Sequence, residues 1–397
     1  MRTPARIELA AFATATLATV LIASDQGGYF ERTWPWAGLA VAAAGVLALR
    51  SDVRVPGAAS LVLVAATGAI AAWTALSWLW SSEPAATSSE ALRAPIYLTA
   101  AIAFVALASA GGRLGLVLGV AAGTTGLAVY SLAHRQLTPG QGKLLAEPLG
   151  YANALGALCA IGLVIVVSLG VARRMPLAAV PAVLLVVALA LTSSRGAWLA
   201  LAAGGLVAAA ATRGWGGRAA ALVAVALGTL LTVPAFTVVD RLQARGGYWH
   251  AAWHVGLRHP LGGTGAGTYD LAWAAFGDVG RWGGALDAHS LYLEMLAELG
   301  VVGLVLTLAL AAPVVAALRS ELDPVATAAA AAGIVFLVHA GLDWDWEMPA
   351  VTVSGIACLA AAAPLGKRHV NRAQSTLLVL ESALVGLYGV AILLRKA

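Results

Sequence analysis

The sequence predicts an all-α fold, a polytopic bundle of about 12–13 transmembrane helices with one long extracytoplasmic loop. Hydrophobic residues make up 60% of the 397 residues and charged residues only 11%, and the mean hydropathy is +0.86. Apolar stretches of about 20 residues, the length of helix that crosses a hydrocarbon core, recur along the whole chain. Little polar surface is left for water, so the composition indicates an integral membrane protein.

The expected spans follow the apolar stretches in chain order. They lie near residues 7–24, 36–50, 57–80, 95–111, 113–133, 151–172, 176–193, 196–212, 219–239, 289–318, 325–342, 349–365 and 375–394. With the N-terminus inside, arginines gather in the cytoplasmic loops and most carboxylates on the opposite side, which is the positive-inside pattern. We therefore expect a single integral membrane domain over residues 1–397. The net charge of +5 reflects this topology and indicates no nucleic-acid partner.

The two cysteines, Cys159 and Cys358, both fall inside expected spans. No disulfide framework is predicted, and both are expected to be inert buried thiols.

The longest polar segment, residues 240–287, is expected as a loop on the outer face. A loop of this length without its own fold is usually functional. Its "YWHAAWHVGLR" stretch is expected to form a short interfacial helix, and "GGTGAGT" a tight turn with close backbone approach. His250 and His254 have the spacing of metal ligands on a helix, but no third ligand follows, and no metal site is predicted.

His289, at the end of this loop, is the candidate catalytic residue. If Asp287 caps the next helix, His289 lies in its first turn, where the helix dipole disfavours a positive charge on the ring. Such a histidine stays neutral near pH 7 and can accept a proton. Tyr292 would share its face, whereas Glu294 and Glu298 would point largely to the other side and contact water. The alternative is a histidine that merely caps a helix at the interface.

Five arginines are expected on the outer face, where the orientation rule does not place cations. They are Arg93, Arg195, Arg241, Arg245 and Arg258. A guanidinium group binds phosphate in a bidentate way and keeps its charge, so these residues are candidates for binding a pyrophosphate. Pairing with nearby carboxylates or with lipid headgroups is the alternative.

The segment "HAGLDWDWEMPA", residues 339–350, brings further polar side chains to the outer end of a span. His339 and Asp343 are expected on one helical face, with a role in orienting the base or the acceptor. Two alternatives remain open. The aspartates could hold a divalent cation, or the tryptophans could form an aromatic belt beside a solvated acidic rim.

Five stretches in this order resemble the bacterial O-antigen ligase and polymerase superfamily. They are "WSSEPAATSSEALRAPIYL", "YANALGALCAIG", "TSSRGAWLAL", "HPLGGTGAGTY" and "DAHSLYLEMLAELGVVGL". The resemblance covers roughly residues 75–350. By position, Arg195 matches the arginine of the family's middle motif and His289 matches the histidine at the end of the long loop. Arg241, Arg245 and Arg258 match the loop arginines less closely.

This resemblance implies a metal-independent, inverting glycosyltransferase in a bacterial cytoplasmic (inner) membrane, with its active face outside the cytoplasm. The implied donor is a polyprenyl-pyrophosphate-linked glycan, and the acceptor is a glycan, lipid or protein. No cofactor is expected, and membrane lipids are the other partners. Ligase and polymerase differ in acceptor, and the residues do not separate them. A transporter or flippase of an anionic lipid-linked sugar, and a scaffold of the cell envelope, are the competing classes.

Overall fold

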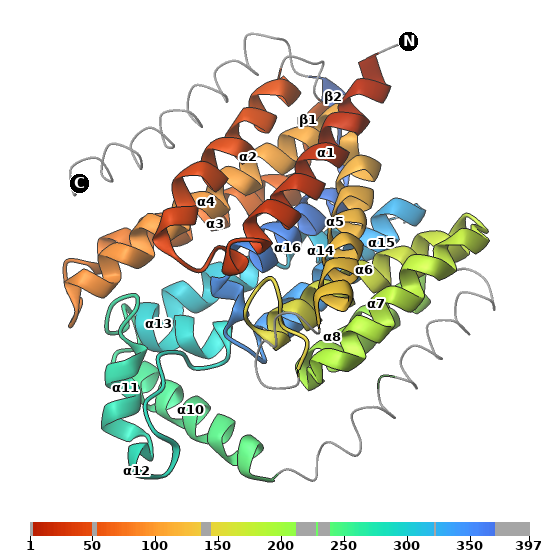
Figure 1. Cartoon of the computed structure of the whole chain (residues 1–397). Helices are drawn as coiled ribbons and strands as arrows, with labels where there is room; N and C mark the ends of the chain where they lie inside the picture. Colours follow the sequence, from red (N-terminus) through yellow and green to blue (C-terminus); the bar gives the residue numbers. More distant parts are fainter. Residues whose placement is uncertain are drawn as a thin grey trace.

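The computed structural model describes residues 3–49, 54–135, 144–211, 239–320 and 323–369, together with Gly228. It confirms an all-α helical bundle (Figure 1). Five helical segments of the described chain are long and apolar enough to cross a membrane: Ala5–Ala23, Ala58–Ser77, Pro84–His134, Ala152–Ala172 and Leu291–Leu318. Four shorter apolar segments accompany them: Pro176–Thr192, Arg195–Ala211, Pro324–Ala340 and Pro349–Ala362.

The helices follow the expected order along the chain. The first part holds α1 (Thr3–Ala23), α2 (Trp34–Leu49), α3 (Ala58–Ser77), α4 (Pro84–Leu107), α5 (Arg113–His134), α6 (Ala152–Ala172), α7 (Ala179–Thr192) and α8 (Arg195–Ala211). The second holds α10 (Val239–Arg258), α11 (Tyr269–Phe276), α12 (Val279–Trp282), α13 (Leu291–Ala309), α14 (Ala312–Leu318), α15 (Pro324–Ala340) and α16 (Pro349–Ala362). Apart from Gly228 and Val239, the expected spans at 219–239 and 375–394 lie outside the described residues.

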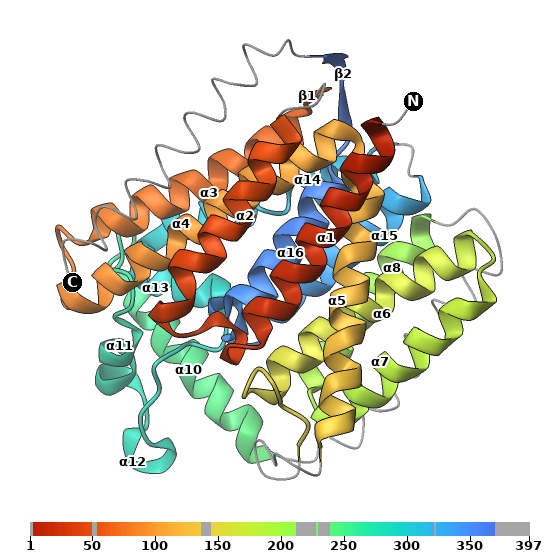
Figure 2. The same cartoon turned by 45° about the horizontal axis from the view of Figure 1, so that its top comes forward.

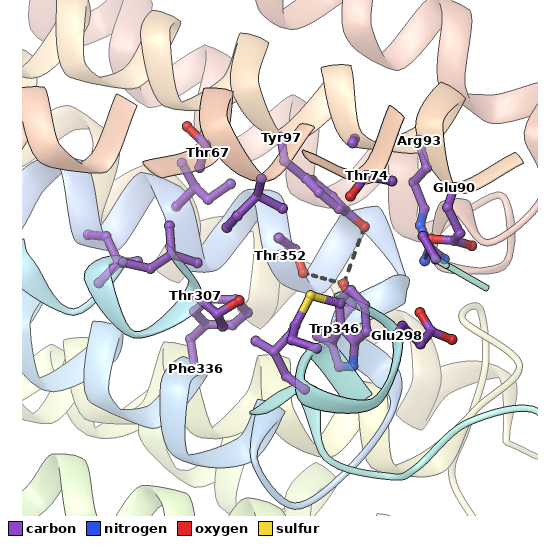
Figure 3. Close-up of a pocket in the computed structure, with 18 residues that line it drawn as sticks. Thr67, Thr74, Glu90, Arg93, Tyr97, Glu298, Thr307, Phe336, Trp346 and Thr352 are labelled. Atoms are coloured by element: carbon purple, nitrogen blue, oxygen red, sulfur yellow. Dashed lines mark hydrogen bonds and ion pairs between the residues drawn. The ribbon is translucent and has the colours of Figure 1, made fainter. Parts of the chain in front are cut away.

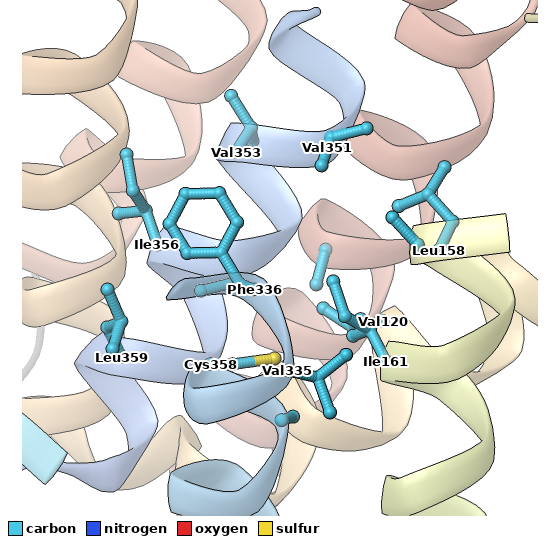
Figure 4. Packing of buried hydrophobic residues seen from close by; sticks show 14 of the residues in the cluster. Val120, Leu158, Ile161, Val335, Phe336, Val351, Val353, Ile356, Cys358 and Leu359 are labelled. Atoms are coloured by element: carbon cyan, nitrogen blue, oxygen red, sulfur yellow. The ribbon is translucent and has the colours of Figure 1, made fainter. Parts of the chain in front are cut away.

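Helices α15 and α16 form the centre of the bundle. Every residue of α16 is buried, and α15 packs against α6, α8 and α16. Small residues allow this close approach, since a Cβ on Gly333 of α15 would lie 2.8 Å from the Leu359 side chain of α16. Figure 4 shows Phe336 among the aliphatic side chains of α16. Cys159 and Cys358 are free and buried in this core, as expected.

The outer faces of the bundle carry large apolar side chains. Exposed examples are Leu9, Leu17, Leu61, Leu177, Val180, Val183, Leu206, Val305 and Leu308. Contiguous exposed apolar surface of this kind is what lipid covers in a membrane protein.

Two expected boundaries are corrected. Helix α4 begins at Pro84, where a proline suits the first helical position, so residues 84–93, which lie between the expected spans at 57–80 and 95–111, are helical. The expected span at 289–318 is divided into α13 and α14, and α13 itself is kinked at Gly300 (φ 67°, ψ −166°). A Cβ at Gly300 would lie 2.3 Å from the Leu261 carbonyl oxygen, so the kink makes room for the loop after α10.

A short antiparallel pair, β1 (Arg54–Pro56) with β2 (Leu365–His369), was not expected from the sequence. It lies at the end of the molecule opposite to α10, α11 and α12 (Figures 1 and 2).

The expected outer loop is itself folded. Helix α10 is longer than expected and α11 packs against it, so that Ala251, Ala252, Val255, Tyr269, Trp273, Ala288 and Ala297 form a small second core with α13. This core fixes the chain on both sides of the segment that leads into α13.

Candidate active site

His289 lies immediately before α13 and not within its first turn. The helix begins at Leu291 with Ser290 at the N-cap position, so the expected cap at Asp287 is wrong. His289 adopts a left-handed backbone conformation (φ 53°), which is uncommon for a residue with a Cβ. The histidine is therefore presented by a sharp turn.

The side chain of His289 is half-buried. Its ring stacks on Tyr248 of α10, with centroids 5.1 Å apart. Nδ1 lies 3.3 Å from the Asp287 carbonyl oxygen. Because a carbonyl can only accept, the neutral ring makes this bond with its proton on Nδ1, which leaves the Nε2 lone pair to accept another. Burial lowers the pKa of His289 below its ordinary value, so the ring is neutral at pH 7.

A polar group centred on Asp343 lies on one side of this histidine. The buried Asp343 carboxylate accepts hydrogen bonds from Tyr151 (2.8 Å), Asn153 (2.6 Å) and Arg245 of α10 (2.7 Å). Both Asp343 and Arg245 act electrostatically on His289. Three segments far apart in the sequence thus meet beside the candidate base.

His339 lies beside the start of α8. Asp343 follows the end of α15, so the two expected residues do not share a helical face. The buried His339 instead bonds through Nδ1 to Asp345 (3.1 Å). Its Nε2 has no hydrogen-bond partner in the described part of the chain, and it lies 3.4 Å from a Cβ built on Gly196. Gly196 is the second residue of α8, which Arg195 begins.

A second, acidic group adjoins the turn through Asp287. Carboxylate oxygens of Asp287, Glu294 and Glu347 lie within 4.8 Å of one another. Arg93 of α4 bonds Glu347 (2.9 Å) and also Glu90. Burial, followed by the Glu347 carboxylate, raises the pKa of Asp287. The Arg93 side chain is only 3% exposed, so its charge stabilises these carboxylates and is shielded from solvent.

The spacing of these three carboxylates would also suit a small cation, because carboxylate oxygens are the usual ligands of Mg²⁺ and Ca²⁺. Arg93 already supplies a positive charge at Glu347, and we assign no metal to the group.

Glu294 and Glu298 were expected to contact water, but they are buried, with 2% and 4% exposure. Glu294 accepts the Ala288 amide (2.9 Å). Glu298 accepts the Gly267 amide (2.8 Å) and the Tyr269 amide (3.0 Å). The second turn of α13 is therefore covered by the chain between α10 and α13, residues 259–290.

The "GGTGAGT" stretch is a tight turn with close backbone approach, as expected. Three of its glycines, Gly263, Gly265 and Gly267, have positive φ angles. Its amides donate within the protein: Thr264 to the Ala297 carbonyl (3.1 Å), Gly265 to the Glu298 carbonyl (2.9 Å) and Ala266 to Ser77 (3.1 Å). These amides hold the turn against α13 and α3, and are not available to a phosphate.

Three candidate residues remain, and the structure describes the side chains of two of them. Arg258 is exposed and stacks on Phe276 (4.5 Å). It follows Arg245 by 13 positions on α10, about 20 Å along the helix axis. The Tyr292 hydroxyl donates to the Leu337 carbonyl (2.8 Å), which packs α13 on α15. Arg241 belongs to α10, but its side chain lies outside the described residues.

Sequence reasoning did not single out Tyr151, Asn153, Tyr248 or Glu347 as site residues. Tyr151 and Asn153 are polar residues at the start of an otherwise apolar helix. That position is a usable signal, because a polar side chain costs free energy at a membrane helix unless it has a partner.

Comparison with known proteins identifies residues 180–308 as a match to the family model described as O-antigen ligase. No curated protein matches the chain. The matched residues run from α7 into α13 and include Arg195, Arg245 and His289. Three of the five stretches that carry the resemblance lie within the match, which confirms the resemblance over residues 180–308.

Proposed function

We propose that this chain, which carries an O-antigen ligase domain over residues 180–308, transfers a glycan from a polyprenyl-pyrophosphate carrier to an acceptor hydroxyl. The reaction takes place at the outer face of a bacterial cytoplasmic membrane. One observation carries the proposal. Within the matched segment, a neutral imidazole with its Nε2 lone pair unused by Asp287 stands beside the Arg245–Asp343 group.

The chemical step assigned to His289 is proton removal from the acceptor. Nε2 takes the hydroxyl proton while the acceptor oxygen forms a bond to the anomeric carbon. The bond from that carbon to the pyrophosphate oxygen breaks, and polyprenyl pyrophosphate leaves with the electron pair. Attack opposite to the leaving group inverts the anomeric configuration. General-base catalysis of this kind contributes on the order of 10²–10⁴ in rate.

Positive groups are needed where charge grows on the leaving pyrophosphate. We assign this role to Arg245 and Arg195. Arg195 starts α8, and the N-terminus of a helix adds partial positive charge for an anion. The buried Nε2 of His339 lies beside Gly196 in the first turn of α8. Arg245 is paired with Asp343, but its side chain is 27% exposed and can contact a further anion. Arg93 is only 3% exposed and bonds both Glu90 and Glu347, so we assign it to the acidic group and not to the donor.

The arginines also support the metal-independent mechanism that the resemblance implies. A guanidinium performs the charge stabilisation that a divalent cation would otherwise supply. Transfer is therefore expected to continue at an undiminished rate in excess EDTA.

A partly open cavity provides a site for the lipid tail of the donor. It lies between α3 and α4 on one side and α13, α15 and α16 on the other (Figure 3). Glu90, Arg93 and Glu298 gather at one end, whereas Thr67, Thr307 and Phe336 line the remainder with aliphatic residues. An apolar cavity with a few polar groups at one end suits an isoprenoid chain joined to a polar head.

The test uses purified protein in liposomes with a defined polyprenyl-pyrophosphate oligosaccharide, and it resolves product length on gels. Wild type, His289→Ala and His250→Ala are compared. His250 is an exposed histidine of α10 and serves as the matched control. We expect transfer by wild type and His250→Ala, and a loss of about 10²–10⁴ in rate for His289→Ala.

The products also separate the two acceptor classes. A ladder of longer lipid-linked glycans would identify a polymerase, and transfer only after an envelope acceptor is added would identify a ligase. No transfer by wild type with either acceptor would contradict the proposal in favour of a transporter or a scaffold. Full activity of His289→Ala would remove the histidine from the mechanism.

A further inference from the structure

The turn that presents His289 has to be held by its surroundings. A left-handed conformation is unfavourable for a residue with a Cβ, because the Cβ crowds the following carbonyl. Such residues persist where neighbouring contacts fix the backbone, and they are frequent at functional sites. The φ angle of His289 is 53°, so the groups that fix its flanking residues decide where the imidazole points.

Glu294 makes a hydrogen bond on each side of this turn. Its side-chain Oε2 accepts the amide of Ala288, which precedes His289, at 2.9 Å. Its own amide donates to the carbonyl of Ser290, which follows His289, at 2.9 Å. In the described chain the Ser290 side chain caps no amide of α13. The arrangement resembles a capping box, except that the glutamate reaches past the N-cap residue to the residue before the histidine.

The residues around Glu294 leave this contact little freedom. Ala288 is fully buried in the second core, and Glu294 is 2% exposed. Glu347, paired with Arg93, lies beside both Asp287 and Glu294. Asp287 in turn supplies the carbonyl that lies 3.3 Å from His289 Nδ1. Burying a carboxylate in an apolar helix costs free energy. The position of the turn, which depends on Glu294, accounts for a carboxylate at this place.

Glu298 provides an internal comparison one helical turn further along α13. It is buried to a similar extent, and it also accepts backbone amides of the chain between α10 and α13. Its partners, Gly267 and Tyr269, belong to the glycine turn and α11 and do not adjoin His289.

We propose that Glu294 is a positioning residue for His289, acting as the hydrogen-bond acceptor that fixes Ala288 and thereby aims the imidazole. This inference rests on the proposed function, because it assumes that His289 is the base. The required property is an oxygen at the correct distance and not a negative charge.

Two substitutions separate these properties. Glu294→Gln removes the charge but keeps an oxygen that reaches Ala288. Glu294→Asp keeps the charge but shortens the side chain by one methylene, so that the oxygen falls short. Displacement of a catalytic group by about 1 Å costs about 10²-fold in rate. We expect kcat close to wild type for Glu294→Gln, a loss of about 10²-fold for Glu294→Asp, and little change in the KM for the donor.

The pH profile supplies a readout that a purely structural role would not move. In Glu294→Asp the released imidazole meets more water, so the acidic limb of kcat is expected to move to higher pH. Asp278→Ala is the control, because it removes a carboxylate that accepts a backbone amide at the start of α12, and its acidic limb should stay where it is in wild type. Tryptophan fluorescence during thermal unfolding in detergent measures the folded fraction, to which each rate is referred.

The outcomes are distinguishable from those of the proposed function. If wild type transfers no glycan, the function has failed and the variants decide nothing further about it. If wild type is active and Glu294→Asp matches it in kcat and pH profile, Glu294 does not position the base. Loss in Glu294→Gln with retention in Glu294→Asp would show that charge matters, and would also overturn the inference.

Discussion

The basicity of His289 is set by individual neighbouring residues. Tyr248 covers one face of the imidazole and excludes water from it. The Asp287 carbonyl lies within reach of the Nδ1 proton, and the Asp343 charge acts on the ring from further away. Burial is the largest of these effects and disfavours imidazolium. The base therefore keeps its neutral form below the pH at which an exposed histidine would become protonated.

A pH profile of transfer tests this assignment. Because the neutral ring is the active form and its pKa is lowered, activity should be complete at pH 7. It should fall on acidification only below about 6.5, the ordinary imidazole value. Tyr248→Ala admits water to the ring, so its acidic limb should move up towards that value. Rates of wild type and variant between pH 5 and 8 measure the shift.

Tyr248→Phe is the control for this experiment, because it keeps the aromatic face and removes only the hydroxyl. Its acidic limb should coincide with that of wild type. Identical limbs for Tyr248→Ala and wild type would mean that the titrating group is not His289.

Residue identity alone did not predict which arginines are committed to carboxylates. Arg93 looked like a phosphate ligand, but Glu90 three positions earlier and Glu347 far along the chain both bond it. Arg245 is paired with Asp343, 98 positions away. A single sequence contains the charges but not these long-range pairings, which arise from packing of α4 and α10 against the segment after α15.

At the level of elements, the sequence predicted the long apolar helices but not α11, α12, the separation of α14 or the details of α13. Aspartate before an apolar stretch is a common N-cap signal, and it placed the start of the helix too early. The signal failed because the amide of Ala288 is satisfied by Glu294 from within the helix. The kink at Gly300 was missed for a related reason, since it depends on the approach of Leu261. The start of α13 and its kink at Gly300 both depend on the chain between α10 and α13, which packs on this helix.

Gly263 is the position where that docking is most demanding. Its φ angle is positive (66°), and an added Cβ would lie 2.1 Å from the Glu298 carbonyl carbon. Gly263→Ala should therefore lower the free energy of unfolding by at least 1–3 kcal/mol, the order of magnitude of backbone strain alone. Thermal unfolding in detergent, followed by tryptophan fluorescence, measures the change.

Gly246→Ala is a suitable control on α10, because nothing lies within 4 Å of its added Cβ. Alanine is a better helix former than glycine by up to about 1 kcal/mol, so this variant should be as stable as wild type or more so. Equal stability of the Gly263 and Gly246 variants would contradict close docking of the glycine turn on α13.

On the scale of the whole molecule, the bundle combines a packed centre with an open cavity. Helices α15 and α16 are almost fully buried, yet a partly open cavity remains between α3, α4, α13, α15 and α16. The polar end of that cavity adjoins the acidic group of Asp287, Glu294 and Glu347, because Arg93 lines the cavity and bonds Glu347. A lipid in the cavity would therefore hold its head close to the candidate base.

Filling the cavity tests whether a lipid tail occupies it. Thr307 lines the cavity and is 1% exposed, whereas the next residue, Leu308, is 54% exposed on the outer face of α13. Thr307→Phe should displace part of an isoprenoid chain. Losing burial of two methylene equivalents costs about 1.6 kcal/mol, so the KM for a long-chain donor should rise by roughly tenfold. Leu308→Phe adds a ring on the lipid-facing side and should leave KM unchanged.

A donor with a truncated polyprenyl chain distinguishes occupancy of the cavity by the lipid tail from general damage to the fold, because its transfer should be nearly equal in wild type and Thr307→Phe. An equal loss with long and short donors would place the tail elsewhere, since the substitution would then act through the fold and not through the lipid.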